Sequence, residues 1–192
     1  PTFDRFNENR DGWVKILKDS GLQFDFIAYS AVESGELVSK GYKTFVLPMS
    51  VALSDREIGA IREFVSRGGT VIADAMPGIM DEHCTFRAVR PLQDVFGIAA
   101  MPGTREALIK AAGDPGLNLA GANALVQESR GPLLLSHSFG KGRAYLLNRF
   151  LCEYPAERVE GRAAPLLDRL LLVLKDAGLR PKVTVSGPGG EL

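Results

Sequence analysis

The sequence has 192 residues, of which 45% are hydrophobic and 24% are charged. This balance is typical of a globular domain and excludes a disordered or collagen-like chain. The 23 basic and 23 acidic residues cancel, and no run of Lys and Arg forms the basic patch typical of nucleic-acid-binding proteins. The longest strongly apolar run, Leu170 to Leu174, is far shorter than the roughly 20 residues that span a bilayer. We therefore expect neither nucleic acid nor a membrane as a partner.

Both ends of the chain indicate a piece of a longer protein. The start, PTFDRFNENRDGW, has no initiator Met and none of the basic and apolar regions of a signal peptide. The end, RPKVTVSGPGGEL, has the pattern of a strand that enters a linker. We expect one α/β domain over residues 1–180, and a linker or the start of a following domain over residues 181–192. The compartment stays open, with the cytoplasm favoured.

The first predicted helix contains Trp13, Ile16 and Leu17 at helical spacing, with Gly21 placed to follow its last turn. A doubly wound sheet usually has a central strand before its first helix. Only PTFDRF is available for that strand, so we expect it to be short or partly missing from this piece of the chain.

Two strands are predicted next. The runs FDFIAY, Phe24 to Tyr29, and YKTFVLP, Tyr42 to Pro48, are rich in aromatic and aliphatic residues, and the second stops at a proline. The residues between them, Ser30 to Gly41, are expected to form a polar link.

The clearest helix signal follows these strands. Ser54 with Glu57 three residues later is a capping-box pattern. Apolar residues then repeat on one helical face: Ile58, Ile61, Phe64 and Val65. The next run, Thr70 to Asp74, is typical of a short strand that a parallel sheet buries on both faces. Strand, helix and strand with short links predict a βαβ unit.

The second half of the sequence has weaker periodicity. Between Met80 and Gly131, only a short helix over PLQDVFG is predicted. The segments GPLLLSHSF and GRAYLLNRF, joined through glycines, predict a β-hairpin. A long helix is expected from Ala164 to Gly178.

The segment GYKTFVLPMSVALSDREIGAIREFVSRGGTVIADAMPGIMDEH resembles the middle domain of family 42 glycoside hydrolases, the β-galactosidase trimerisation domain. The matching features are YK before a strand that ends at Pro48, the LS helix start, the double glycine after the helix, and FGI and GKGRAYLLN further on. The resemblance implies a flavodoxin-like or class I glutamine amidotransferase-like α/β fold, with a mostly parallel sheet flanked by helices and a C-terminal β-hairpin.

The resemblance also implies a function. In that family, two glutamates on a separate TIM barrel carry out the hydrolysis, and this sequence does not contain the barrel. A non-catalytic accessory domain of a multidomain β-galactosidase-like glycoside hydrolase is therefore implied, without a cofactor. Its implied partners are other copies in a homo-oligomer, a trimer in the family, and other domains of the parent chain. The domain would assemble the oligomer or shape a neighbouring active site.

The stretch RGGTVIADAMPG falls where amidotransferases of this fold carry a G-x-C-x-G elbow, whose cysteine needs a nearby histidine as its base. Here Asp74 takes the place of the first glycine and Met76 that of the cysteine, and a thioether is not a nucleophile for this reaction. The later segment LNRFLCEYP offers Glu153 but no histidine. We therefore predict no catalytic residues.

A ligand site is the alternative use of this region. Open α/β folds bind ligands at the carboxyl ends of their strands, where Asp74 and Asp81 are expected to flank a pocket. The predicted ligand-binding residues are Asp74, Met76, Asp81 and His83. The competing interpretation, which we favour, is that Asp74 caps a backbone amide in the turn.

Metal and disulfide chemistry is not indicated. Asp81, Glu82, His83 and Cys84 are possible ligands in a row, but consecutive residues do not converge on one ion, so a solvated loop is predicted. Cys84 and Cys152 lie far apart and have no CxxC partner.

Other functions stay open at this point. His137, in the middle of a predicted strand, is interpreted as a structural or surface histidine. A carbohydrate- or small-molecule-binding module is one rival function. A stand-alone hydrolase that uses Asp74, Asp81 and His83 is the other.

Overall fold

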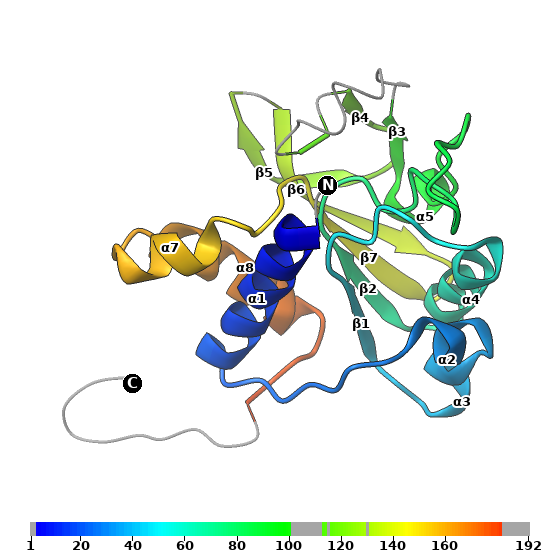
Figure 1. Cartoon of the computed structure of the whole chain (residues 1–192), viewed down its shortest axis with the longest axis horizontal. Helices are drawn as coiled ribbons and strands as arrows, with labels where there is room; N and C mark the ends of the chain where they lie inside the picture. Colours follow the sequence, from blue (N-terminus) through cyan, green and yellow to red (C-terminus); the bar gives the residue numbers. More distant parts are fainter. Residues whose placement is uncertain (1–2, 101–112, 115, 130, 182–192) are drawn as a thin grey trace.

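The computed structural model describes residues 3–100, 113–114, 116–129 and 131–181. These residues form three layers, in which a central sheet lies between two groups of helices (Figure 1). The predicted α/β fold class is confirmed. The predicted end of the domain at residue 180 stays a prediction, and most of the expected linker lies outside the described residues.

Within the described residues, the main sheet has five strands in the spatial order β1-β2-β7-β6-β5. Their bounds are Thr44–Leu47 for β1, Thr70–Ala73 for β2, Asn123–Glu128 for β5, Gly131–Phe139 for β6 and Gly142–Leu147 for β7. The strands β1, β2 and β7 are parallel, β6 runs against β7, and β5 runs against β6. All but β6 therefore point the same way. The strands β3 (Ile98–Ala100) and β4 (Leu117–Leu119) form a separate antiparallel pair.

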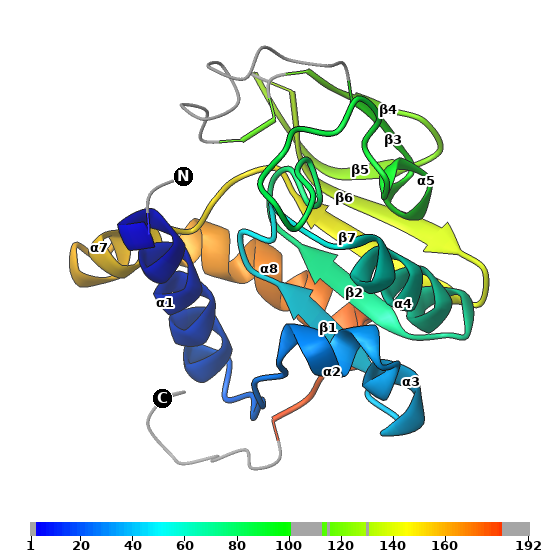
Figure 2. The same cartoon turned by 45° about the vertical axis from the view of Figure 1, so that its right-hand side comes forward.

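Each face of the sheet has its own apolar core, because successive residues of a strand point to opposite sides. In β2, Val71 and Ala73 face one core and Ile72 faces the other. The helices that cover the Ile72 face are α1 (Phe3–Asp19), α7 (Tyr154–Val159) and α8 (Ala164–Asp176) (Figure 2). Those on the other face are α2 (Tyr29–Glu33), α3 (Glu36–Ser39), α4 (Asp55–Ser66) and α5 (Gln93–Phe96). None of the helices in the described part of the chain is long and apolar enough to cross a membrane.

The helix α4 confirms the predicted capping box. The Ser54 hydroxyl accepts a hydrogen bond from the Glu57 backbone N–H at 3.1 Å, and the Glu57 carboxylate accepts one from the Ser54 N–H at 2.8 Å. The predicted apolar face of the helix is buried. The helix connects β1 to β2, so the predicted βαβ unit is also confirmed.

The strand expected over PTFDRF is wrong. The helix α1 already begins at Phe3, and β2 gains its second parallel neighbour from β7, far along the chain. The two phenylalanines of this segment, Phe3 and Phe6, are three residues apart in the sequence, a spacing that favours a helix over a strand.

The strand expected over Phe24–Tyr29 is also wrong. Residues 22–28 form no strand or helix, and α2 begins at Tyr29. Phe24 packs against the core beneath α1, whereas Ile27 packs against the core beneath α4. The segment therefore links the two layers instead of pairing with the sheet, and this leaves Phe26 75% exposed. The expected polar link after it is instead folded into α2 and α3.

The elements predicted in the second half are confirmed where they are described. β6 and β7 pair as an antiparallel hairpin from Leu134–Leu147 to Phe139–Gly142. The long helix is α8, and PLQDVFG contains the short helix α5. The strands β3, β4 and β5 were not predicted, because they are short or solvent-exposed and show no clear alternation.

Two glycine substitutions test the packing of α4 on the hairpin. A Cβ on Gly142 would lie 2.1 Å from the Val65 carbonyl oxygen, whereas a Cβ on Gly59, in the exposed part of α4, would meet nothing within 4 Å. We expect Gly142→Ala to lower the free energy of unfolding by about 2 kcal/mol. Gly59→Ala should raise it by about 0.5 kcal/mol, because alanine favours the helix. Urea denaturation measures both, and equal effects would contradict this packing.

Candidate functional site

The carboxyl ends of β1 and β2 meet at Asp74, the residue that directly follows β2. Its side chain is buried, with 1% of the residue exposed. The carboxylate accepts hydrogen bonds from Asn9 Nδ2 at 2.6 Å and from Trp13 Nε1 at 2.9 Å, both on α1. It also accepts one from the Met49 backbone N–H, which lies 2.8 Å from both carboxylate oxygens. Asp74 therefore joins α1 to the ends of two strands.

Burial raises the pKa of Asp74 to about 7, because the ionised form loses its hydration in the interior. The hydrogen bonds from Trp13, Asn9 and Met49 lower the pKa and offset only part of this effect. Asn9 is itself fully buried, and its Oδ1 accepts a hydrogen bond from the Leu151 N–H at 2.5 Å. Each polar atom in this cluster therefore has a partner, as the interior requires.

Met76, at the tip of the turn after β2, is part of an apolar plug. We use this name for the buried cluster at the strand ends that contains Met49, Ala75, Met76, Ile79, Met80 and Phe150. Met76 and Met49 have φ values of 59° and 43°, in the left-handed region that costs a non-glycine residue about 1 kcal/mol. In a nucleophile elbow a helix follows the turn. Here, the described chain forms no helix between Met76 and α5.

The space beside Met76 is small. A cavity of about 10 Å³ is lined by Met76, Pro77, Arg90, Leu92, Gln93, Phe96, Ile98, Asp114 and Leu146. This volume holds about one water molecule, so no sugar ring enters it.

One wall of this cavity is a buried ion pair. Arg90 donates to both carboxylate oxygens of Asp114, and both side chains are largely buried. The Asn148 amide holds the Asp114 backbone, with its Oδ1 2.6 Å from the Asp114 N–H donor. This ion pair neutralises the charge of Arg90 within the fold.

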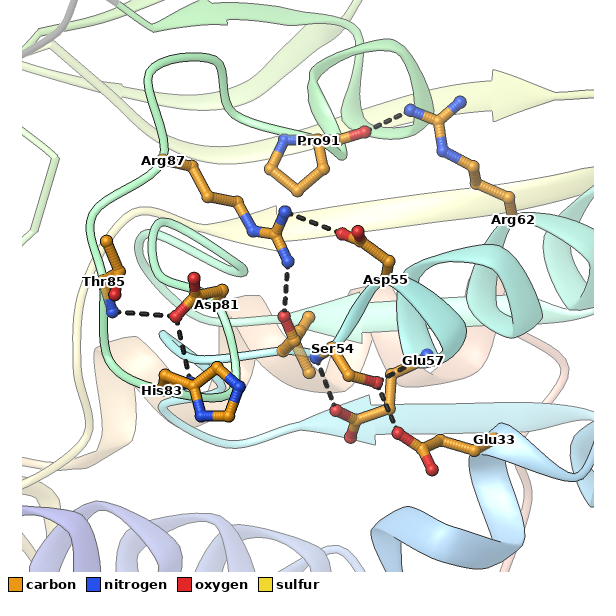
Figure 3. Close-up of polar contacts among 11 residues, drawn as sticks. Glu33, Ser54, Asp55, Glu57, Arg62, Asp81, His83, Thr85, Arg87 and Pro91 are labelled. Atoms are coloured by element: carbon orange, nitrogen blue, oxygen red, sulfur yellow. Dashed lines mark hydrogen bonds and ion pairs between the residues drawn. The ribbon is translucent and has the colours of Figure 1, made fainter.

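Asp81 and His83 lie in an exposed loop (Figure 3). The Asp81 carboxylate accepts hydrogen bonds from the backbone N–H groups of His83 at 2.9 Å and Thr85 at 2.8 Å. These bonds lower the pKa of Asp81, with the Thr85 N–H the largest cause. Asp81 thus closes a turn with its own neighbours. The structure shows no hydrogen bond from Asp74 to Asp81 or His83, so the predicted ligand residues form two separate groups.

Arginines fasten this loop and the next to α4 (Figure 3). Arg87 donates to the Leu53 carbonyl at 2.9 Å and pairs with Asp55 at 2.7 Å. Arg62 pairs with Asp94 and donates to the Pro91 carbonyl. These contacts give the basic residues near the strand ends a structural role.

Two of the other residues considered from the sequence, His137 and Cys152, contact residues far away along the chain. His137 Nδ1 lies 3.0 Å from the Val95 carbonyl and therefore acts as a donor, and its ring packs on Gly97. Cys152 contacts Arg5, and Cys84 is exposed. No group of three or more metal-binding side chains gathers in the part of the chain that the structure describes.

Sequence reasoning missed the polar partners of Asp74. Asn9, Trp13 and Ile16 follow one another at helical spacing, and all are buried. An asparagine on the apolar face of a helix was therefore a usable signal, because a buried amide requires partners. The pair of Arg90 and Asp114 had no such signal, since it joins two segments without regular periodicity.

A comparison with known protein families identifies the family of this chain. The model of the β-galactosidase trimerisation domain matches residues 5–109, more than half of the chain. This chain belongs to the β-galactosidase trimerisation domain family. The match runs from within α1 past β3, and it includes Asp74 with its three donors and the apolar plug except Phe150. A comparison with curated protein sequences found no match.

Solved structures show the same fold. A catalytic mutant of Gan42B, a β-galactosidase from G. stearothermophilus, aligns over 95% of this chain with 19% identity and a TM-score of 0.71. The β-galactosidase from Bacillus circulans sp. alkalophilus aligns over 97% with 20% identity and a TM-score of 0.69. The chain spans little more than a quarter of those proteins, 27% and 29%. A cytoplasmic protein from Salmonella typhimurium has 12% identity and a TM-score of 0.54, with 84% of this chain and 85% of that one aligned.

Replacing the buried carboxylate tests its structural role. Asp74→Ala leaves the donors of Asn9, Trp13 and Met49 buried without an acceptor, so we expect the free energy of unfolding to fall by about 3 kcal/mol or more. Asp81→Ala should lower the free energy of unfolding much less, because water can take the place of the Asp81 carboxylate at this exposed turn. Chemical denaturation of both variants measures the difference, and a stable Asp74→Ala protein would refute this role.

Proposed function

We propose that this chain is a non-catalytic accessory domain of a β-galactosidase-like glycoside hydrolase, and that it takes part in assembling the oligomer. Membership of the trimerisation domain family supports this assignment. The catalytic part of the parent protein would then lie in another domain.

The observation that carries the proposal is the filled end of the sheet. Met76 occupies the apex where related folds present a nucleophile, and only 2% of it is exposed. The carboxylate of Asp74 is engaged by three donors, and the adjoining cavity holds about one water. These observations support a non-catalytic role for this turn.

An activity assay tests the non-catalytic part of the proposal. The 192-residue chain should release no nitrophenol from a panel of nitrophenyl galactosides and no nitroaniline from nitroanilide amides. Hydrolysis that disappears in a folded Asp74→Ala variant would overturn the proposal in favour of a stand-alone hydrolase. Circular dichroism of the variant provides the control for folding.

Sedimentation velocity tests the assembly part. If the domain associates with its own copies, the sedimentation coefficient should rise with concentration between about 1 and 100 µM, toward a species larger than one chain. A monomer over this whole range would contradict self-assembly by this domain. It would leave the non-catalytic assignment in place, because the activity assay tests that separately.

A further inference from the structure

The strand β1 is an edge of the main sheet, because β2 is its one neighbour among the described residues. The Thr70 N–H donates to the Lys43 carbonyl at 2.9 Å, so the backbone groups of Lys43 and Phe45 face β2. The backbone groups of Thr44 and Val46 face away from β2. The structure shows no backbone hydrogen bond from these outward groups to any described residue. The outer edge of β1 therefore presents open donors and acceptors.

The residues of β1 are not those of a protected edge. Natural edge strands carry charges, prolines or bulges that prevent further pairing. The four residues of β1, TFVL, include no charge and no proline, and their register with β2 is continuous. Both faces are covered, because Phe45 packs against the core beneath α4 and Val46 against the core beneath α1. The Thr44 hydroxyl is buried and has no hydrogen-bond partner among the described residues. These features are typical of an inner strand of a parallel sheet.

Residues 22–28 lie on the outer side of β1 and do not pair with it (Figure 1 and Figure 2). Their side chains alternate between two sides, as in a strand. Phe24 and Phe26 contact each other with ring centres 5.7 Å apart, whereas Ile27 packs on the opposite core. Residues 23–27 nevertheless form no backbone hydrogen bond with the described chain. Two segments thus lie at the same edge with open backbone groups, and neither pairs with the other.

We propose that the outer edge of β1 binds one more β-strand, which a part of the parent protein outside these 192 residues supplies. The added strand lies parallel to β1, between β1 and residues 22–28, and pairs with the outward backbone groups of Thr44 and Val46. Because both faces of the sheet are covered at this edge, the side chains of the added strand are apolar on both faces. The inference rests on the proposed function, in which this chain is one domain of a larger hydrolase.

The order of the elements identifies this occupant. In the flavodoxin-like strand order 2-1-3-4-5, the first strand lies between the second and the third. Residues 22–28 follow α1 as the second strand does in that order, and β1 follows α2 and α3 as the third does. The open place is therefore that of the first strand. The solved β-galactosidases that share this fold are much longer than this chain, and a parent of such length has residues to fill it.

A second folded copy fits this edge less well than a single strand. Paired strands lie about 4.8 Å apart, so the sheet of another copy would have to approach β1 closely. Residues 22–28 cross the outer side of β1 and stand in the way of that approach (Figure 2). One extended segment needs much less room than a whole sheet with its helices.

Hydrogen exchange of single β1 amides tests the proposal. In the 192-residue chain, the Thr44 and Val46 amides should exchange at least about tenfold faster than the Phe45 amide, which is bonded to β2. In the full-length parent protein, the Thr44 and Val46 amides should exchange at least about a hundredfold more slowly than in the 192-residue chain, and the Phe45 amide is the internal control. Equal rates in the two proteins would overturn the proposal. Protection of Thr44 and Val46 that appears in the 192-residue chain at high concentration would assign the edge to a second copy and refute it too.

Substitution of Thr44 in the parent protein provides a second test. Thr44→Pro removes the outward N–H and is compatible with an edge strand, so it should lower the protection of the Val46 amide at least about tenfold. Thr44→Val keeps that N–H and should preserve the protection. An unchanged Val46 amide in Thr44→Pro contradicts the pairing. A failure of either test is separate from a failure of the proposed function, because the activity and sedimentation assays use the 192-residue chain alone.

Discussion

The fold depends on the hydrogen bonds that one buried carboxylate, Asp74, accepts. Asp74 follows β2 at the point where a parallel sheet ends and its backbone groups lose their strand partners. By accepting hydrogen bonds from Asn9, Trp13 and the Met49 backbone, it joins α1 to β1 and β2. The cost of burying this charge shows in its raised pKa. The interior tolerates that cost because the same contacts order the first helix and the turn after β1.

Around this carboxylate, strained turns, a buried ion pair and an acidic turn residue, all common in active sites, stabilise the fold instead. The left-handed backbone at Met76 and Met49 is of the kind that often marks catalytic turns, yet both side chains are buried in the apolar plug. Arg90 and Asp114 neutralise each other beside them. Asp81 stabilises its own turn. In this chain, which belongs to the trimerisation domain family, buried apolar side chains thus cover the strand ends.

The sequence predicted those elements whose signals are local. The capping box of Ser54 and Glu57 and the apolar face of α4 depend on neighbours within one or two turns, and both are as expected. The hairpin of β6 and β7 follows from two apolar runs and their glycine link. The strand predicted over Phe24–Tyr29 is wrong, because aromatic and aliphatic residues favour a strand wherever they occur. Here they cover two cores at the edge of the sheet.

By itself, the sequence determined the α/β class, the family and the position of Met76 in the turn after the strand Thr70–Asp74, since each of these depends on residue types and short spacings. Only the tertiary structure decided what Asp74 does, because its partners on α1 lie more than 60 residues away. The same holds for Arg90 and Asp114, and for the entry of β7 beside β2. Burial and pairing over such distances arise when the chain packs, and no local pattern records which polar groups will then meet.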